Sequence, residues 1–254
     1  MKLVLLAAGK SSRIFDKIKK NKCLIKINNK SLIQSIIDNA YQSSIDDIDI
    51  ITGFKPENIK KDLKDYKHIN YIKNSKYKTT DMVYSALLSL KKKKEDTIIS
   101  YTDIFYERDV FKKLLKNKTR SITLPYINNW KKVWSLRKKN IFDDAETFRL
   151  DSKANLKEIG NKISKKNLKF INGQFMGIIY IPKKYISKVI KFYENYNNHK
   201  IQFTGFLNYL ISNKIKINCI KYEKFWYEFD DYDDLNNFNK LKNSNLKKLL
   251  KNNL

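Results

Sequence analysis

The sequence is poor in the residues that mark disulfide scaffolds, collagen-like repeats and flexible linkers. Its 254 residues include only two cysteines, six glycines and three prolines. Two cysteines are too few for a disulfide framework or a cysteine-rich zinc site, so we expect two buried thiols in a reducing compartment. Since no segment is rich in Gly and Pro, none is identified as a linker between domains. The composition predicts one folded globular unit.

Long apolar runs are also missing. The run at residues 3–8 is too short for the apolar region of a secretory signal, and it ends at Gly9. No stretch approaches the roughly 18 consecutive apolar residues that a membrane-spanning helix needs. We therefore expect a cytoplasmic protein without membrane insertion.

Acidic residues are scarce relative to basic ones, with 26 Asp and Glu against 53 Lys and Arg, a formal net charge of +27. Such a balance normally suggests nucleic acid as a partner. However, nearly all the basic residues are lysines spread along the chain, whereas base and phosphate recognition relies on the planar arginine guanidinium. We expect no nucleic-acid binding. A basic nucleic-acid-binding protein remains the non-enzyme alternative, and the positive charge also suits attraction of a nucleoside triphosphate.

Apolar strands and amphipathic helices alternate along the first half of the chain. Strands are predicted at 2–6, 48–52, 69–72 and 97–101, and helices at 31–41, 56–63 and 82–90. In the second half, strands are predicted at 121–126, 133–137, 148–150, 175–181 and 215–222, and helices at 183–193 and 203–212. This alternation is typical of βαβ units, in which helices cover both faces of the sheet. We expect an α/β protein with a three-layer α/β/α, Rossmann-like, mostly parallel sheet.

No linker divides the chain, so we predict a single domain over residues 1–242. Within it, we distinguish a first half, residues 1–120, from a second half, residues 121–242, which we expect to supply a lid over the carboxyl edge of the sheet. Residues 243–254 are rich in Lys and Asn and are predicted to be a basic tail. Ligands of open α/β sheets bind beyond the carboxyl ends of the strands, which is where we expect the site.

The strongest local signal directly follows the first predicted strand, where residues 6–13 read LAAGKSSR. Small residues let the backbone approach a ligand, and successive amide groups can form a nest for phosphate oxygens. Arg13 adds a permanently charged fork that suits a polyphosphate. The segment fits neither a Walker loop nor the dinucleotide Gly-x-Gly-x-x-Gly pattern. It indicates a phosphate-binding loop at the carboxyl edge of the sheet.

A second chemical signal is Asp103, which follows the buried strand predicted at 97–101. A carboxylate at the carboxyl end of a strand faces the same edge of the sheet as the Gly9 loop. Mg²⁺ bound to nucleotide phosphates usually takes one or two such protein carboxylates. Asp103 is therefore a candidate ligand of Mg²⁺.

The opening segment resembles the L-A-A-G-x-[GS]-[ST]-R signature of the nucleotidyltransferases that activate sugar phosphates and phosphocholine. Residues 21–33, NKCLIKINNKSLI, resemble that family's P-K-x-L-x-x-I-x-G-K segment, with Asn21 and Asn29 in place of the usual Pro and Gly. The resemblance implies that Lys22 contacts the phosphates and the charge developing at the α-phosphorus. Residues 226–235, WYEFDDYDDL, resemble the family's closing motif and imply Asp230 as the second metal ligand beside Asp103.

The same resemblance implies that residues 1–120 are the nucleotide-binding half and residues 121–242 the acceptor-binding and lid half. It also supplies the expected nucleotide site. It implies nucleotide contacts from the opening loop, from the lysine segment and from the start of the helix predicted at 82–90, namely Leu6, Ala7, Ala8, Gly9, Ser11, Ser12, Arg13, Lys22, Thr80, Asp81 and Ser85. Relatives often have Asn near Asp81, so its part in reading the base stays open. The implied catalytic residues are Arg13, Lys22 and Lys162.

The acceptor site is implied by a second series of segments. Trp130 and Trp134 are followed by DAETF at 144–148, GNK at 160–162 and GQFMG at 173–177, similar to a series in phosphocholine- and phosphonate-activating cytidylyltransferases. That similarity implies that Lys162 holds the acceptor's phosphate. It also implies that the acceptor pocket is lined by Trp134, Glu146 and Gln174. An aromatic cage beside a carboxylate suits an ammonium group.

The resemblance as a whole implies a Mg²⁺-dependent cytidylyltransferase. Such an enzyme transfers CMP from CTP to a small acceptor, such as phosphocholine, an aminoalkylphosphonate or a phospho-amino acid, releases pyrophosphate, and serves surface polysaccharide or lipid decoration. The alternative enzyme is a sugar-1-phosphate nucleotidyltransferase that uses UTP, dTTP or GTP. Residues 160–162 replace the E-K-P series of those enzymes, which favours CTP. A monomer and a homodimer are both compatible with the sequence.

Overall fold

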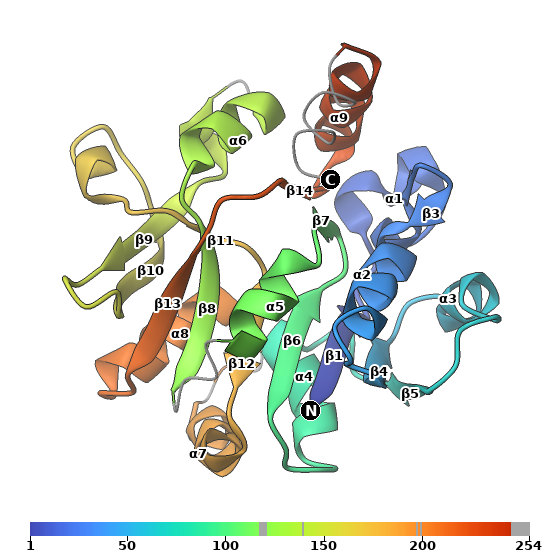
Figure 1. Cartoon of the computed structure of the whole chain (residues 1–254), viewed down its shortest axis with the longest axis horizontal. Coiled ribbons are helices and arrows are strands. Elements are labelled where there is room, and N and C mark those ends of the chain that lie inside the picture. Colours follow the sequence, from blue (N-terminus) through green and yellow to red (C-terminus); the bar gives the residue numbers. More distant parts are fainter. Residues whose placement is uncertain (117–120, 139, 197, 199, 245–254) are drawn as a thin grey trace.

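The computed structural model describes residues 1–116, 121–138, 140–196, 198 and 200–244, which form a sheet covered by helices on both faces (Figure 1). Strand β1 (Lys2–Ala7) lies near the middle of the sheet. It pairs in parallel with β4 (Asp47–Thr52) on one side and with β6 (Thr97–Tyr101) on the other. Beyond β4, the parallel strand β5 (Ile69–Lys73) ends the sheet. These strands confirm the βαβ units predicted for the first half.

The other side of the sheet is mixed in direction. Strand β12 (Ile178–Ile181) pairs antiparallel with both β6 and β8 (Ile122–Ile127). Strand β8 also pairs in parallel with β13 (Ile217–Tyr222) and antiparallel with the short β11 (Gln174–Phe175). The strand order is β11-β8-β12-β6-β1-β4-β5, with β13 beside β8. The observed sheet is therefore mixed and mostly parallel, as predicted.

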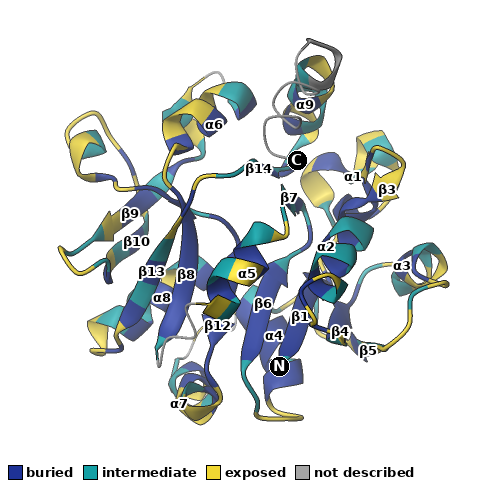
Figure 2. Cartoon of the chain, viewed as in Figure 1, coloured by how far each residue is buried: buried dark blue, intermediate teal, exposed yellow. Residues whose placement is uncertain are grey.

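Alternate side chains of the central strand enter two separate cores. Leu3 and Leu5 pack with α2 (Leu32–Tyr41), α3 (Pro56–Asp62) and α5 (Asp109–Lys116). Val4 and Leu6 point to the opposite face and pack with α4 (Met82–Leu90), α7 (Lys183–Glu194) and α8 (Phe203–Ser212). The strands β1, β4, β6, β8 and β12 between the two helical layers are almost entirely buried, whereas the edge strand β5 is largely accessible (Figure 2). This arrangement is the predicted three-layer α/β/α fold.

Several short elements and the longer helix α9 gather at the carboxyl edge of the sheet. They are α1 (Ser12–Ile18), the 3₁₀ turn η1 (Lys22–Leu24), β2 (Lys26–Ile27), β3 (Lys30–Ser31), β7 (Ile104–Tyr106), β14 (Trp226–Glu228) and α9 (Tyr232–Ser244). Strand β14 pairs antiparallel with β7, and the Phe229 amide donates to the Asp103 carbonyl at 2.9 Å. This pairing brings the closing segment of the chain beside the end of β6.

The segment predicted as a strand at 133–137 is helical, which corrects our prediction. It belongs to α6 (Trp130–Arg137), in which Trp130, Val133, Trp134 and Arg137 are buried. Their spacing of three and four residues places them on one helical face. The prediction was wrong because the adjacent Val133 and Trp134 also favour a strand. Likewise, the strand predicted at 175–181 is divided into β11 and β12 at Gly177, whose φ is +76°.

The remaining elements build the second half of the chain around a hairpin. Strands β9 (Glu146–Leu150) and β10 (Leu156–Lys162) pair antiparallel outside the main sheet, and α8 packs against β10. Two 3₁₀ turns, η2 (Ile141–Asp143) and η3 (Leu168–Phe170), flank this hairpin in the chain. Both cysteines are buried and free. Of the predicted basic tail, residues 245–254 lie outside the described residues. Within the described ranges, every helix is too short or too polar to cross a membrane.

Candidate active site

A cavity of about 350 Å³, here called the nucleotide cavity, opens beside the loop that follows β1. Its lining comes from that loop, from η1, from the end of β6 and from the start of α4: Leu6, Ala7, Gly9, Ser11, Ser12, Arg13, Asn21, Lys22, Cys23, Asp81, Met82, Tyr101, Thr102, Asp103 and Gln202. A Cβ added at Gly9 would meet no atom within 4 Å, so the backbone there faces open space. The predicted phosphate-binding loop thus borders a cavity whose size suits a nucleotide.

Hydrogen bonds from three other segments hold this loop in place. The Thr102 hydroxyl donates to the Leu6 carbonyl at 2.8 Å, and the Phe54 amide donates to the Ala8 carbonyl at 3.1 Å. Ser11 has a left-handed φ of 58°, and its hydroxyl accepts from the Lys22 amide at 3.0 Å. The loop and Lys22 therefore form one connected unit.

Three predicted nucleotide residues lie before or within α4. Asp81 lines the nucleotide cavity and caps α4, accepting from the Met82 amide at 2.7 Å. The hydroxyl oxygens of Thr80 and Ser85 lie 3.1 and 3.0 Å from the Nδ2 of the buried Asn74, which donates to both. Thr80 and Ser85 thus support the turn that presents Asp81.

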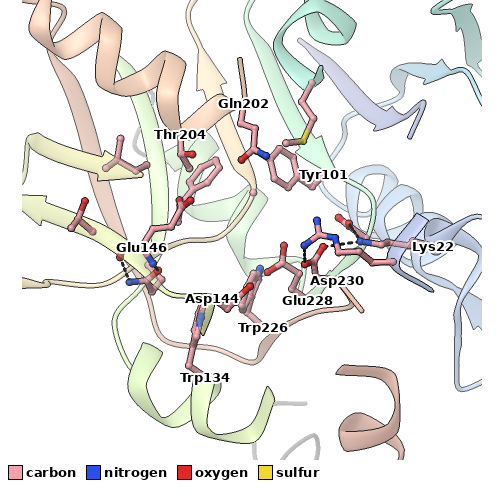
Figure 3. Close-up of a pocket in the computed structure, with 18 residues that line it drawn as sticks. Lys22, Tyr101, Trp134, Asp144, Glu146, Gln202, Thr204, Trp226, Glu228 and Asp230 are labelled. Atoms are coloured by element: carbon pink, nitrogen blue, oxygen red, sulfur yellow. Dashed lines mark hydrogen bonds and ion pairs between the residues drawn. The ribbon is translucent and has the colours of Figure 1, made fainter. Parts of the chain in front are cut away.

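Lys22 lies between the two predicted metal ligands. Its Nζ is 3.4 Å from Oδ2 of Asp103 and 2.8 Å from Oδ1 of Asp230, and Arg13 pairs with the other oxygen of Asp230 (Figure 3). Burial opposes the charge on Lys22, but the two carboxylates outweigh burial and raise its pKa above the ordinary value. Four predicted residues from three distant segments therefore meet at one point.

The donor set fits a divalent cation. Asp103 and Asp230 offer hard carboxylate oxygens, and the space between them already accommodates the positive charge of Lys22. Throughout the part of the chain that the structure describes, no three or more His, Cys, Asp or Glu side chains are grouped so that they could hold a metal ion together. An ion held by two carboxylates, with water and phosphate completing its shell, is the arrangement that Mg²⁺ prefers at nucleotide sites.

A second cavity of about 290 Å³, here called the acceptor cavity, adjoins the first. The two share Arg13, Lys22, Met82, Tyr101, Asp103 and Gln202. The rest of its lining is Trp134, Asp144, Glu146, Thr147, Ile159, Gln174, Phe175, Gly177, Thr204, Trp226, Glu228 and Asp230. Figure 3 shows these side chains converging from α6, β9, α8 and β14 toward Lys22. Lys22 and Asp103 therefore stand where the two cavities join.

Glu146 and Gln174 form one wall of the acceptor cavity. Gln174 accepts from the Glu146 amide at 3.1 Å and donates to the Glu146 carbonyl at 2.5 Å, so it fixes the position of Glu146. Burial raises the pKa of the Glu146 carboxyl; Thr204 opposes this shift by hydrogen bonding, and the negative charge of Asp144 adds to it. A cationic ligand close to this carboxyl would favour its ionised, negatively charged form.

Two stacked indoles form the opposite wall. The rings of Trp134 and Trp226 lie 5.5 Å apart at 11°, and Trp130 packs behind Trp134 as part of the core. Trp226 donates to the Met176 carbonyl at 3.1 Å. The buried Nε1 of Trp134 has no hydrogen-bond partner among the residues that the structure describes. Trp134 lines the cavity, and its unpaired N–H is a candidate donor to a bound acceptor.

One predicted catalytic residue lies apart from the others. Lys162 ends β10 opposite Glu146, but its side chain is exposed and it does not belong to the lining of either cavity. Its role on the acceptor's phosphate stays a prediction. Conversely, Gln202 and Thr204 line the acceptor cavity although no sequence pattern marks them. Only the packing of α8 against β10 brings them there.

Comparisons with known proteins agree with this geometry. Residues 3–165 match the model of the MobA-like NTP transferase domain. The chain is 30% identical over 251 residues to the CTP:phosphoglutamine cytidylyltransferase of Campylobacter jejuni, with coverage of 92% of this chain and 98% of that protein.

Solved structures share the fold at lower identity. The CTP:phosphocholine cytidylyltransferase of Streptococcus pneumoniae superposes with a TM-score of 0.71 at 16% identity, covering 95% of this chain and 98% of that one. The inositol-1-phosphate CTP transferase of T. maritima gives a TM-score of 0.73 at 16% identity, covering 96% of each chain. The domain model spans more than half of the sequence and the Campylobacter alignment nearly all of it. The chain therefore belongs to the MobA-like NTP transferase family and is a nucleotidyltransferase.

Proposed function

We propose that the protein transfers CMP from CTP to a small phosphorylated acceptor that carries an ammonium group, and releases pyrophosphate. The observation that carries this proposal is the junction of two cavities at Lys22 and Asp103. A reaction between a nucleotide and a second substrate needs two adjoining sites with cationic groups where the phosphates meet. CTP is favoured because the Campylobacter relative and both solved structures named above are described as acting with CTP.

The chemistry follows from the charges at the junction. An oxygen of the acceptor's phosphate attacks the α-phosphorus and forms a P–O bond, while the bond from the α-phosphorus to the bridging oxygen breaks. Pyrophosphate leaves with that electron pair. A phosphate dianion is already a competent nucleophile, so no general base is required. Lys22 stabilises the negative charge that develops at the α-phosphorus, and Arg13 stabilises the departing phosphates.

We further propose that the working enzyme uses Mg²⁺ at Asp103 and Asp230. When bound there, the ion would neutralise phosphate charge and lower the repulsion between the two substrates. The chain's own contribution is to hold the two carboxylates beside Lys22, which keeps positive charge at the junction.

The acceptor cavity favours a cation. Its lining includes the carboxylates of Asp144, Glu146 and Glu228 together with the faces of aromatic rings. Carboxylates and aromatic faces both attract ammonium groups. Phosphocholine and phosphoglutamine, which name two of the relatives, each carry such a group. A CDP-linked product would be an activated form suited to decorating a surface polysaccharide or lipid.

Pyrophosphate release tests the proposal. CTP, UTP, dTTP and GTP are each assayed with phosphocholine, phosphoglutamine, 2-aminoethylphosphonate and glucose-1-phosphate, with Mg²⁺ and with EDTA. We expect turnover with CTP and an ammonium-bearing acceptor, and none with EDTA or in the Asp103→Asn variant. Product with only UTP or dTTP and the sugar phosphate would contradict the proposal and establish the alternative enzyme.

A further inference from the structure

Arg137, the last residue of α6, is fully buried behind the acceptor cavity. Its guanidinium contacts Asp234 through two nitrogens, at 3.2 and 3.3 Å. It also pairs with Glu228 at 3.0 Å and with Asp144 at 3.1 Å. A fully buried charge is stable only where partners compensate it. Here one arginine gathers three carboxylates, one that follows η2 and two from the closing segment at residues 226–235.

On one side, these contacts fix the wall of the acceptor cavity. Asp144 and Glu228 line that cavity, and so do Trp134 and Trp226, whose ring centroids lie 4.9 and 5.8 Å from the guanidinium carbon of Arg137. In Figure 3 these four side chains form a continuous wall. Arg137 therefore holds both the acidic and the aromatic parts of this wall from behind.

On the other side, Asp234 connects Arg137 to Asp230, the predicted metal ligand. The Asp234 oxygen that binds Arg137 at 3.3 Å also accepts from the amide of Asp230 at 2.9 Å and from the amide of Asp231 at 3.2 Å. Lys138 lies 3.2 Å from the same oxygen. The backbone of Asp230 is thus fixed by Asp234, and its carboxylate is directed toward Lys22.

A purely structural role does not explain this arrangement. Replacing a buried ion pair with apolar residues of similar volume is often neutral or stabilising, so stability alone gives little reason to keep one. Only a forked cation can hold three carboxylates in fixed directions at once. The directions that Arg137 fixes belong to the acceptor wall and to the segment that carries Asp230.

We propose that Arg137 is a positioning residue that sets the acceptor wall and the metal-binding carboxylate of Asp230 in one fixed relative position. This inference rests on the proposed function, because it concerns the same two cavities. It predicts that losing the guanidinium fork weakens cation binding at Asp103 and Asp230 and acceptor binding together, although Arg137 touches neither ligand.

The test compares Arg137→Lys and Arg137→Met with Arg149→Lys, a matched control in which a partly exposed arginine has a single ion pair to Glu158. Mn²⁺ binding is followed by the loss of the free ion's paramagnetic resonance signal, without nucleotide or acceptor. Thermal unfolding is measured for each variant. We expect Mn²⁺ binding to weaken by about tenfold to a hundredfold in the Arg137 variants, the usual range for outer-shell residues, and to be unchanged in the control.

Two further variants separate the contacts of Arg137. Asp234→Asn should weaken Mn²⁺ binding but leave the acceptor KM unchanged, measured with phosphocholine or with the best acceptor of the panel. Glu228→Gln should do the reverse, raising the acceptor KM while Mn²⁺ binding stays unchanged. Arg137→Lys should do both. If the Arg137 variants do not fold, weakened Mn²⁺ binding in a folded Asp234→Asn supports the proposal.

Wild-type Mn²⁺ affinity in a folded Arg137→Lys, or in Asp234→Asn, would overturn the positioning role while leaving the proposed function standing. A wild-type protein that binds no Mn²⁺ would overturn the positioning role and the proposed metal site at Asp103 and Asp230, whereas CMP transfer itself is tested by pyrophosphate release. Since the Mn²⁺ titration needs neither CTP nor acceptor, a wrong choice of substrate does not affect its outcome.

Discussion

The two cavities of this nucleotidyltransferase are built in different ways. The nucleotide cavity is bordered by one short segment rich in small residues, 6–13, whose backbone faces open space at Gly9. The acceptor cavity is lined by large side chains from separate elements, such as Trp134 on α6, Glu146 on β9 and Thr204 on α8. Backbone amide groups suit the phosphates, which every nucleotide has in common. Individual side chains, in contrast, can be substituted one at a time. The difference suggests that the acceptor cavity is where relatives diverge in substrate.

The two cavities also differ in charge. Carboxylates in the acceptor cavity are Asp103, Asp144, Glu146, Glu228 and Asp230, whereas those in the nucleotide cavity are Asp81 and Asp103. Arg13 and Lys22 line both. Phosphates are therefore attracted to the junction, and the remainder of the acceptor cavity attracts a cation.

The largest effect is expected at Lys22, which serves both cavities. Lys22→Ala removes the ammonium at the junction and should lower kcat by about 10²–10³-fold, as loss of a preorganised charge-stabilising donor does. Steady-state pyrophosphate release measures it. Lys26→Ala, which removes an exposed lysine of β2, should leave kcat unchanged. A near-normal rate in Lys22→Ala would mean that the junction of the cavities is not where the reaction takes place.

Glu146→Gln tests whether the two cavities bind separate substrates, because it alters the acceptor cavity alone. Losing a charged partner of the acceptor's ammonium group is worth about 1.5–3 kcal/mol, so the acceptor KM should rise by about tenfold to a hundredfold. The KM for CTP should not change, since Glu146 does not line the nucleotide cavity. Equal rises in both values would show that the two cavities do not bind separate substrates.

The pH dependence of the acceptor KM provides a further test of Glu146. Burial raises the pKa of this carboxyl, so it loses its proton at a higher pH than an ordinary glutamate. The ionised form attracts the acceptor's ammonium group, and the acceptor KM should therefore fall as pH rises through that pKa. Glu146→Gln cannot titrate and should lose this part of the pH profile. An unchanged profile in the variant would assign the dependence to another group.

Trp134→Phe probes a single hydrogen bond in the acceptor cavity. The variant keeps an aromatic ring but loses the Nε1 donor, which has no partner within the described residues. One hydrogen bond contributes about 1 kcal/mol, so the acceptor KM should rise about fivefold. Trp130→Phe is the control, because Trp130 lies in the core and outside the cavity lining. The same rise in both variants would indicate altered packing rather than a lost donor.

The difference between the cavities also explains what could be predicted from the sequence. Strand β1, the loop after it and Asp103 at the end of β6 are contiguous features, and local hydrophobic patterns were enough to predict them. Lys22 has no local pattern, because it is one of many lysines, and only the family resemblance identified it. Its place between Asp103 and Asp230 is a finding of the structure.

The acceptor half was less predictable because long-range packing forms it. Residues 133–137 were predicted as a strand, yet they form a helix whose buried face covers β14 through the stacking of Trp134 on Trp226. Arg137 looked like an ordinary basic residue, and its three carboxylate partners lie between seven and 97 positions away in the chain. No local pattern can predict such a cluster.

The smallest effect is expected at Lys162, and this variant also tests whether the acceptor cavity is complete before its ligand binds. The family resemblance assigns it to the acceptor's phosphate, whereas its side chain is exposed at the end of β10. An exposed charge contributes about 0–1 kcal/mol, so Lys162→Ala should raise the acceptor KM by at most about fivefold and leave kcat nearly unchanged. Lys157→Ala, on the same strand and also exposed, is the matched control.

A loss of kcat as large as in Lys22→Ala would mean that the β9–β10 hairpin closes over the bound acceptor and brings Lys162 to the phosphates. The acceptor cavity would then be completed only when its ligand binds, unlike the nucleotide cavity, whose loop is already held in place by Thr102 and Phe54.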